Sequence, residues 1–348
     1  MKPLITLASL LLFQIAFGQQ PYYSDVDLTL TGEALYTELQ QKISIASGSF
    51  TYGDIRDTVK ITDENPSNTS DVLLVYGYND SDGNCTTDRT RNKNNFGGSG
   101  CEYNREHVFA RSNANPAMGS VDNSSTGIAA DPHNVRPSDQ QMNSNKGNKK
   151  FAAGSGNAGN VGTGNWYPGD EWKGDVARMM MYMYTRYGDR CLPSLNGVGS
   201  SQGSTDMLQI YLQWNAEDPV NDFEDQRNPY LETVYGNRNP FIDNPYLATL
   251  IWGGPVAEDR WGLLNNNDLS AFDLSVYPNP VEEFVYFTSK GQTAITAYTV
   301  YDLSGKVVLN EDILPSENRI DLSRLSSGMY LIEFNTEEAK RIEKIMLR

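Results

Sequence analysis

The sequence is poor in histidine, in cysteine and in basic residues. Its 348 residues include 2 histidines, 3 cysteines and 28 Lys and Arg against 44 Asp and Glu, which gives a net charge of −16. A chain this acidic cannot attract a polyanion through its total charge, so contact with phosphate would require a local basic patch. The lack of a Cys-x-x-Cys pair argues against a zinc-thiolate site.

Long apolar runs are also missing, except at the start of the chain. Leu4 to Phe17 is apolar but too short to span a bilayer, and Lys2 supplies a positive charge ahead of it. Ala16 and Gly18 provide small residues where a signal peptidase requires them. We therefore expect residues 1–18 to be a signal peptide and the mature protein to be an exported monomer without a membrane span.

Export permits a disulfide among the three cysteines. Cys85 and Cys101 flank a loop rich in Gly and Asn, so we expect them to pair and Cys191 to remain free or buried. The surrounding loop, residues 79–100, carries three basic residues and could hold part of the missing basic patch; they are Arg89, Arg91 and Lys93.

The composition changes near residue 265. Residues 19–265 predict a mixed helical and β domain, residues 266–273 a linker, and residues 274–348 a small all-β sandwich, because short alternating apolar runs there are separated by turns. The overall class is therefore α+β. Within the first domain the pattern predicts a helix with Thr31 as its N-cap and Gly48 as its stop, a buried strand at 71–77, a flexible loop at 152–165 and a helix at about 170–187.

Both histidines lie in the part of the chain that is richest in chemistry-bearing residues. Glu106 and His107 are adjacent, His133 follows, and Asn143 comes ten residues later. A neutral imidazole can take a proton from an attacking water. A carboxylate and an amide oxygen are sufficient protein ligands for Mg²⁺, which keeps most of its waters. These residues therefore have the composition of a site for phosphodiester hydrolysis.

The local pattern around these residues predicts two strands and a helix. Val108 and Phe109 favour a strand that contains Glu106 and His107, and residues 133–136 a second strand ended by Pro137. Ser138 would then cap a helix that runs to about Lys146. This helix would carry Asn143 toward Glu106.

The segment resembles the endonuclease I family of periplasmic and secreted DNases, which is similar to the wider ββα-metal (His-Me finger) nucleases. The resemblance runs from about residue 30 to 252. Its motifs are Arg105-Glu106-His107-Val108, His133-Asn134-Val135-Arg136-Pro137-Ser138, Asn143 with Gly147-Asn148, Arg178, Arg227 and Gly236-Asn237-Arg238-Asn239-Pro240-Phe241.

The resemblance implies a role for each matching residue. His107 would be the general base, and Glu106 and Asn143 would bind one Mg²⁺ ion or another divalent metal. Arg178 and Arg227 would contact or support the scissile phosphate, and His133 and Asn134 would be structural. The implied activity is sequence-nonspecific hydrolysis of DNA, and also of RNA, that leaves 5′-phosphate ends.

Several of these assignments keep an alternative. A salt bridge in the core is the alternative for Arg178. The family places a phosphate-stabilising arginine between the two histidine motifs, where Arg111 and Arg136 are the candidates. Ala110 stands where the family usually has proline, which should loosen the end of the strand. Three lysines after the predicted helix form either a solvated face or a patch that follows phosphates; they are Lys146, Lys149 and Lys150.

The last part of the chain resembles the type A sorting domain of the type IX secretion system. The matching segments are Tyr277-Pro278-Asn279-Pro280, Tyr301 to Val307, Leu325 to Tyr330 and Lys344 to Arg348. The resemblance implies export across the outer membrane by the type IX machinery, through the periplasm to the outside, followed by removal of the domain. A sandwich that stays attached and binds a cell surface or a polysaccharide is the alternative.

Two other functions compete with a secreted nuclease. One is a non-catalytic nucleic-acid-binding or adhesion protein on a nuclease-like fold, although a dead descendant should have lost Glu106, His107 or Asn143. The other is a metal-dependent phosphodiesterase that acts on something other than DNA.

Overall fold

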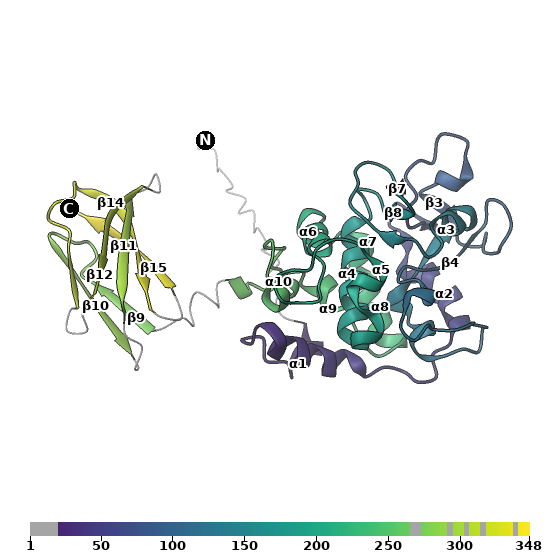
Figure 1. The fold of residues 1–348 in the computed structure, drawn as a ribbon, viewed down its shortest axis with the longest axis horizontal. Coiled ribbons are helices and arrows are strands. Elements are labelled where there is room, and N and C mark those ends of the chain that lie inside the picture. Colours follow the sequence, from purple (N-terminus) through teal and green to yellow (C-terminus); the bar gives the residue numbers. More distant parts are fainter. Residues whose placement is uncertain (1–19, 265–272, 291–294, 303–305, 314–317, 337–339) are drawn as a thin grey trace, which may run out of the picture. The chain divides into compact units, whose positions relative to one another are not determined.

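The computed structural model describes residues 20–264, 273–290, 295–302, 306–313, 318–336 and 340–348. The chain divides into two compact units, residues 1–261 and 262–348 (Figure 1). The predicted signal peptide lies outside the described residues, as does nearly all of the predicted linker. In the described parts of the chain, no helix combines the length and the apolar character needed to cross a membrane.

Helices dominate the N-terminal unit, and its strands are short. The helices are α1 (Gly32–Ser44), α2 (Tyr52–Thr62), α3 (Gln140–Lys146), α4 (Lys173–Tyr187), α5 (Pro193–Asn196), α6 (Gln209–Glu217), α7 (Asp222–Asp225), α8 (Arg227–Val234), α9 (Pro240–Asp243) and α10 (Tyr246–Trp252). The strands are β1 (Glu64–Asn65), β2 (Asn68–Leu73), β3 (Thr90–Asn92), β4 (Tyr103–His107), β5 (Val135–Asp139), β6 (Lys150–Phe151), β7 (Gly159–Val161) and β8 (Asn165–Tyr167). They form sheets in the orders β1-β2-β3, β4-β5 and β6-β8-β7.

The long helix α4 is the centre of the helical part. It packs against α1, α6 and α9, and Figure 1 shows it running among the other helices of this unit. Val176, Met180 and Met183 form an apolar stripe along this helix and are fully inaccessible. The stripe therefore serves core packing.

Three predictions in this unit differ from the structure in detail. Helix α1 follows Thr31 as expected but ends at Ser44, before the predicted stop at Gly48. The predicted strand 71–77 stops at Leu73, because the chain then turns through Tyr76, which has a left-handed φ of 73°. The predicted loop 152–165 contains the strand β7, which pairs with β8.

Strands β4 and β5 and helix α3 form the predicted unit of two strands and a helix, with shifted boundaries. The strands are antiparallel, and Glu106 lies opposite Arg136. Strand β5 continues through Pro137 and does not end there. The sheet has only two strands, so the missing N–H of the proline breaks no hydrogen bond between strands, and the proline carbonyl accepts a hydrogen bond from Val75 N (2.9 Å). The helix cap is Asp139, whose carboxylate accepts from two backbone N–H groups, and not the expected Ser138.

The predicted disulfide is confirmed. Cys85 and Cys101 are bonded, 16 residues apart, and Cys191 is free and buried. The bond closes a loop that leads directly into β4.

We expect removal of this disulfide to destabilise the N-terminal unit. Closing a loop of this length restricts the unfolded chain and contributes about 3 kcal/mol to the free energy of unfolding. The double variant Cys85→Ser/Cys101→Ser should lose about that amount in urea unfolding. Reductant should destabilise the wild type similarly and leave the double variant unaffected; equal stability of the two proteins without reductant would contradict the prediction.

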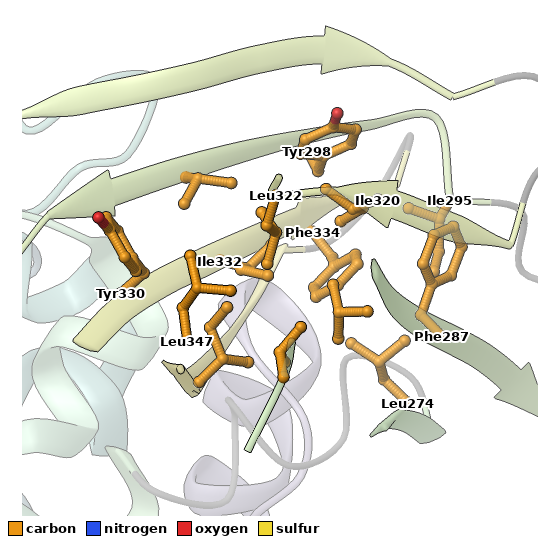
Figure 2. Close-up of a cluster of buried hydrophobic side chains, with 14 residues drawn as sticks. Leu274, Phe287, Ile295, Tyr298, Ile320, Leu322, Tyr330, Ile332, Phe334 and Leu347 are labelled. Carbon is orange, nitrogen blue, oxygen red and sulfur yellow. The ribbon is translucent and has the colours of Figure 1, made fainter. Parts of the chain in front are cut away.

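The C-terminal unit is a small all-β sandwich, as predicted. Its strands are β9 (Asp273–Tyr277), β10 (Phe284–Lys290), β11 (Ala297–Asp302), β12 (Val307–Asp312), β13 (Arg319–Asp321), β14 (Gly328–Asn335) and β15 (Lys340–Leu347). They form a three-stranded sheet, β13-β10-β9, and a four-stranded sheet, β12-β11-β14-β15. Figure 2 shows the apolar core of this unit, in which Phe287 and Phe334 pack with ring centroids 5.3 Å apart.

Candidate active site

The unit of β4, β5 and α3 borders the site. A pocket of about 610 Å³ opens there, and it brings together the three residues that carry the predicted chemistry, Glu106, His107 and Asn143. Strand β4 supplies the first two from its end, and α3 supplies the third from its middle. The remaining lining residues are Tyr52, Arg105, Ala110, Arg111, Ser112, Ala117, Gly119, Ser120, Gly147 and Asn148.

Glu106 is a buried residue of the pocket lining. Tyr76 donates a hydrogen bond to its Oε1 atom (3.2 Å), and the Lys146 ammonium lies 3.4 Å from the same oxygen. Burial raises the pKa of Glu106, while the positive charge and hydrogen bond of Lys146 oppose that rise. Among the described residues no donor reaches Oε2, so one carboxylate oxygen is open.

His107 is held in one tautomer by its surroundings. Its Nε2 atom lies 2.8 Å from the Ala129 carbonyl, which can only accept, so Nε2 carries the proton and Nδ1 has a free lone pair. The ring stacks on Tyr52 with centroids 5.2 Å apart. Burial, together with the smaller effect of the positive charges of Arg111 and Arg105, lowers the pKa of His107 to about 4, although the hydrogen bond to Ala129 acts in the opposite direction. The imidazole is therefore neutral near pH 7, as a general base must be.

Asn143 presents its amide oxygen in a defined direction. Its Nδ2 atom donates to Asn104 Oδ1 (2.7 Å) and, over 3.5 Å, to the Arg105 carbonyl. These two acceptors orient the amide, because only the nitrogen can donate to them. Among the described residues no donor contacts Oδ1.

The open oxygens of Glu106 and Asn143 are of the chemical type that could bind a hard cation. Hard divalent cations such as Mg²⁺ take carboxylate and amide oxygens and fill their remaining positions with water. Within the described residues, no three His, Cys, Asp or Glu side chains are grouped so that they could hold a metal. The two oxygens therefore fit a cation bound mainly through water and two protein ligands.

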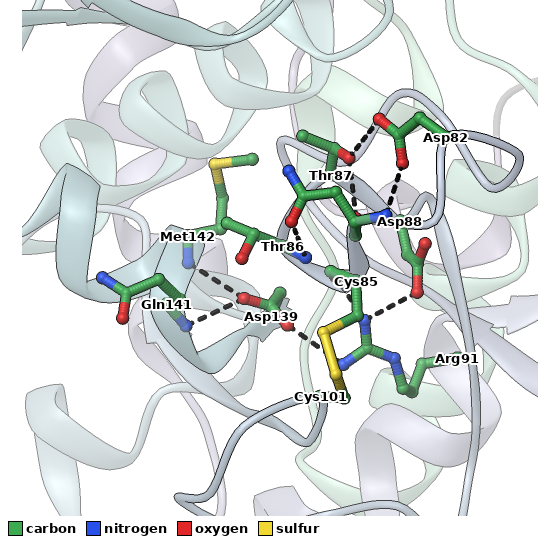
Figure 3. Close-up of a disulfide and its surroundings, with 11 residues drawn as sticks. Asp82, Cys85, Thr86, Thr87, Asp88, Arg91, Cys101, Asp139, Gln141 and Met142 are labelled. Atoms are coloured by element: carbon green, nitrogen blue, oxygen red, sulfur yellow. Dashed lines mark hydrogen bonds and ion pairs between the residues drawn. A yellow bond between two sulfur atoms is a disulfide. The ribbon is translucent and has the colours of Figure 1, made fainter.

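Supporting residues contact this site from other segments, and the sequence patterns did not reveal these contacts. Arg91 donates to Asp139 Oδ2 (3.0 Å) and to the Cys85 carbonyl (2.6 Å), so it links the disulfide loop to the cap of α3. Figure 3 shows this link beside the Cys85–Cys101 bond. The left-handed turn at Tyr76 and the buried Lys146 at the end of α3 complete the support; both bear on Glu106.

The structure does not bring Arg178 or Arg227 to the pocket. Arg178 is fully buried and donates to both carboxylate oxygens of Glu224, at 2.7 and 2.5 Å. Arg227 is buried against Asp63 (2.5 Å) and two backbone carbonyls. Because these guanidinium groups already donate to other residues, the structure does not support the phosphate contacts expected of them. The core salt bridge considered as the alternative for Arg178 is present.

Of the two other candidate arginines, only Arg111 lines the pocket. Its Nη1 atom donates to the Gly119 carbonyl (2.6 Å). Arg136 is 1% exposed and pairs with Asp63 and Asp175. Its burial excludes Arg136 from contact with a substrate in this structure.

The loop expected to hold the basic patch does not hold one. Each of its cations pairs with a carboxylate: Arg89 with Glu171, Arg91 with Asp139 and Asp88, and Lys93 with Glu64. Because each positive charge is neutralised at short range, this part of the prediction was wrong.

His133 and Asn134 have structural contacts. His133 Nε2 lies 3.1 Å from Asn237 Oδ1, and its ring packs on Tyr182 with centroids 4.5 Å apart. Asn134 exchanges hydrogen bonds with the backbone of Phe109, at 2.7 and 3.1 Å, and so joins β5 to the end of β4.

Comparison with known proteins agrees with the resemblance. The family model described as Endonuclease I matches residues 31–246, and that described as Secretion system C-terminal sorting domain matches residues 275–348. An extracellular ribonuclease of Bacillus subtilis (strain 168) is 38% identical over 237 residues, which are 64% of this chain and 75% of that protein. An extracellular ribonuclease of Bacillus amyloliquefaciens is 37% identical over 248 residues, 67% of this chain and 78% of that protein. The chain belongs to the endonuclease I family and is a secreted nuclease with a C-terminal sorting domain.

Proposed function

We propose that the pocket hydrolyses phosphodiester bonds of DNA, and also of RNA, with His107 as the general base and one divalent cation, Mg²⁺, at Glu106 and Asn143. The observation that carries this proposal is that three residues line one pocket: His107, whose Nδ1 atom is unprotonated, and Glu106 and Asn143, each of which has an oxygen that no donor among the described residues contacts. A cation bound there would stabilise the negative charge that develops on the phosphate and on the leaving oxygen.

The protein's own residues account for the proton and for orientation. His107 Nδ1 takes a proton from a water that attacks phosphorus, while the hydrogen bond from Nε2 to Ala129 holds the ring in place. Arg111 lies in the same pocket and can donate to a phosphate oxygen. A bond forms from phosphorus to the water oxygen, and the bond to the 3′-oxygen breaks. The products are a 5′-phosphate and a 3′-hydroxyl, which takes a proton from solvent.

This mechanism does not use the 2′-hydroxyl, and for that reason we propose both DNA and RNA as substrates. The name of the two Bacillus relatives, extracellular ribonuclease, supports RNA. The test is cleavage of plasmid DNA and of RNA by the purified protein with Mg²⁺ or with EDTA, followed by analysis of the ends. Ligatable 5′-phosphate ends in both polymers are expected. Cleavage of RNA alone, with 2′,3′-cyclic phosphate ends, would overturn the mechanism; binding without cleavage under every divalent metal would leave the non-catalytic alternative.

We expect Asn143→Ala to weaken the response to the metal more than it weakens the fold. The variant removes one of the two proposed protein ligands, and the Mg²⁺ concentration for half-maximal cleavage should rise by at least about tenfold. The matched control is Asn145→Ala, because Asn145 lies on the same helix, is exposed and does not line the pocket. Equal metal requirements in the two variants would remove Asn143 from the site.

A further inference from the structure

The unpaired positive charges of the N-terminal unit are not scattered over its surface. Residues 20–264 contain nineteen lysines and arginines, and thirteen of them form an ion pair with a carboxylate. Within this described range, the six cations without such a pair are Arg56, Arg105, Arg111, Lys149, Lys150 and Arg190. All six are exposed or half-buried, so their charge is available to a ligand.

Two of the six line the pocket itself. The Arg105 guanidinium lies 3.6 Å above the Tyr52 ring and donates to the Tyr52 carbonyl. Arg111 donates to the Gly119 carbonyl. Carbonyl groups and an aromatic ring orient these side chains without neutralising them, so each guanidinium keeps its full charge.

Arg56 extends this charge along α2. It follows the pocket residue Tyr52 by four positions, which places both on one face of the helix. Arg56 is close enough to contribute to the lowered pKa of Arg105, after the larger effect of burial. Asp57 is adjacent in sequence, but its carboxylate pairs with Lys60 (2.8 Å).

The other three cations lie on segments that border the pocket elsewhere. Arg190 donates to the carbonyls of Pro116 (3.1 Å) and Ala117 (3.4 Å), and Ala117 lines the pocket. Lys149 and Lys150 directly follow the lining residues Gly147 and Asn148. Lys150 donates to the Ser194 carbonyl (2.7 Å), and Lys149 to the Asn145 carbonyl. Backbone carbonyls again hold cations that no carboxylate neutralises.

We propose that these six residues form a phosphate track, a path of positive charge that binds the sugar–phosphate backbone of a nucleic-acid chain on either side of the bond to be cut. This inference rests on the proposed function and extends it, because it names the residues outside the pocket that would hold the flanking phosphates. Lysine and arginine contacts to phosphates position a nucleic acid without reading its sequence. The net negative charge of the protein repels a nucleic acid, so the track would also be the surface at which the nucleic acid first binds.

The test compares two variants that remove the same amount of charge. In a His107→Ala background of the full chain, Arg56→Gln/Lys150→Gln/Arg190→Gln removes three track cations outside the pocket. The control, Lys42→Gln/Lys60→Gln/Lys173→Gln, removes three cations that are paired with carboxylates. Binding of a labelled DNA duplex is measured by fluorescence anisotropy over a range of salt concentrations, and circular dichroism checks the fold of each variant.

The track variant should bind at least about tenfold more weakly than its parent near 0.1 M salt, and the slope of log Kd against log salt should fall by about 0.9 for each lost phosphate contact. The control should stay within about twofold. Equal losses in the two variants would mean that total charge, and not the track, governs binding, and would overturn the proposal. No loss in either variant would overturn it too.

A second measurement separates this inference from the proposed function. With His107 intact, hydrolysis of the polymer is compared with hydrolysis of bis(p-nitrophenyl) phosphate, which fills only the pocket. Loss of the track cations should lower kcat/KM for the polymer more than for the small diester. If the wild type hydrolyses neither substrate but its binding still depends on the track, the proposed function fails and the phosphate track stands.

Discussion

The variant His107→Ala should lower kcat for nucleic-acid cleavage by about 10² to 10⁴, because a positioned general base contributes that much to proton transfer. Its affinity for a divalent cation and for DNA should remain within a few-fold, since Glu106, Asn143 and the surrounding cations are unchanged. The measurement is single-turnover cleavage with saturating Mg²⁺, together with titration of Mn²⁺ as a probe of the metal site.

The second histidine is the natural contrast. His133 is buried and hydrogen-bonded to Asn237, outside the pocket. His133→Ala should lower the free energy of unfolding by about 1–3 kcal/mol and leave kcat per folded molecule within a few-fold. If His107→Ala cuts as fast as the wild type, or if the two variants lose kcat equally, His107 is not the base.

The variant Arg178→Met should destabilise the N-terminal unit by about 3–5 kcal/mol, because it leaves the Glu224 carboxylate buried without its partner. Replacing both partners, in Arg178→Met/Glu224→Met, should restore most of the lost stability, since a buried ion pair and an apolar pair of similar volume differ little in free energy. Chemical denaturation of the three proteins checks this expectation.

Activity measurements on the same variants decide between the two roles of Arg178. In the structural role, each folded molecule of the double variant should cleave nucleic acid at close to the wild-type rate. A single variant that keeps its stability but loses cleavage would restore the phosphate-contact role that the family resemblance implied. A variant of Arg111 would not test the role of Arg178, because Arg111 lines the pocket.

The buried arginines and the exposed cations near the pocket have different partners. The buried arginines Arg136, Arg178 and Arg227 are surrounded by carboxylates and hold segments together. The cations near the pocket are held by carbonyl groups and keep their charge. On the proposal made above, this separation would let a chain with a net charge of −16 present a positive surface to a polyanion.

The sequence by itself determined the family, the α+β class, the disulfide and the grouping of Glu106, His107 and Asn143. These predictions depended on short motifs and on local periodicity, and both are properties of neighbouring residues. The unit of two strands and a helix spans residues 103–146, so its order along the chain was visible even though its boundaries were shifted. The apolar alternation in the C-terminal part predicted the sandwich for the same reason.

Only the tertiary structure decided which charged residues are neutralised. Asp63 pairs with Arg136 and Arg227, which are 73 and 164 positions away in sequence. Tyr76 and Lys146 reach Glu106 from separate segments, and a left-handed turn at Tyr76 is needed for one of them. The sequence alone does not distinguish an arginine that contacts phosphate from an arginine that is buried in an ion pair. The difference between them is the nearest carboxylate, and long-range folding of the chain, not local pattern, brings that carboxylate close.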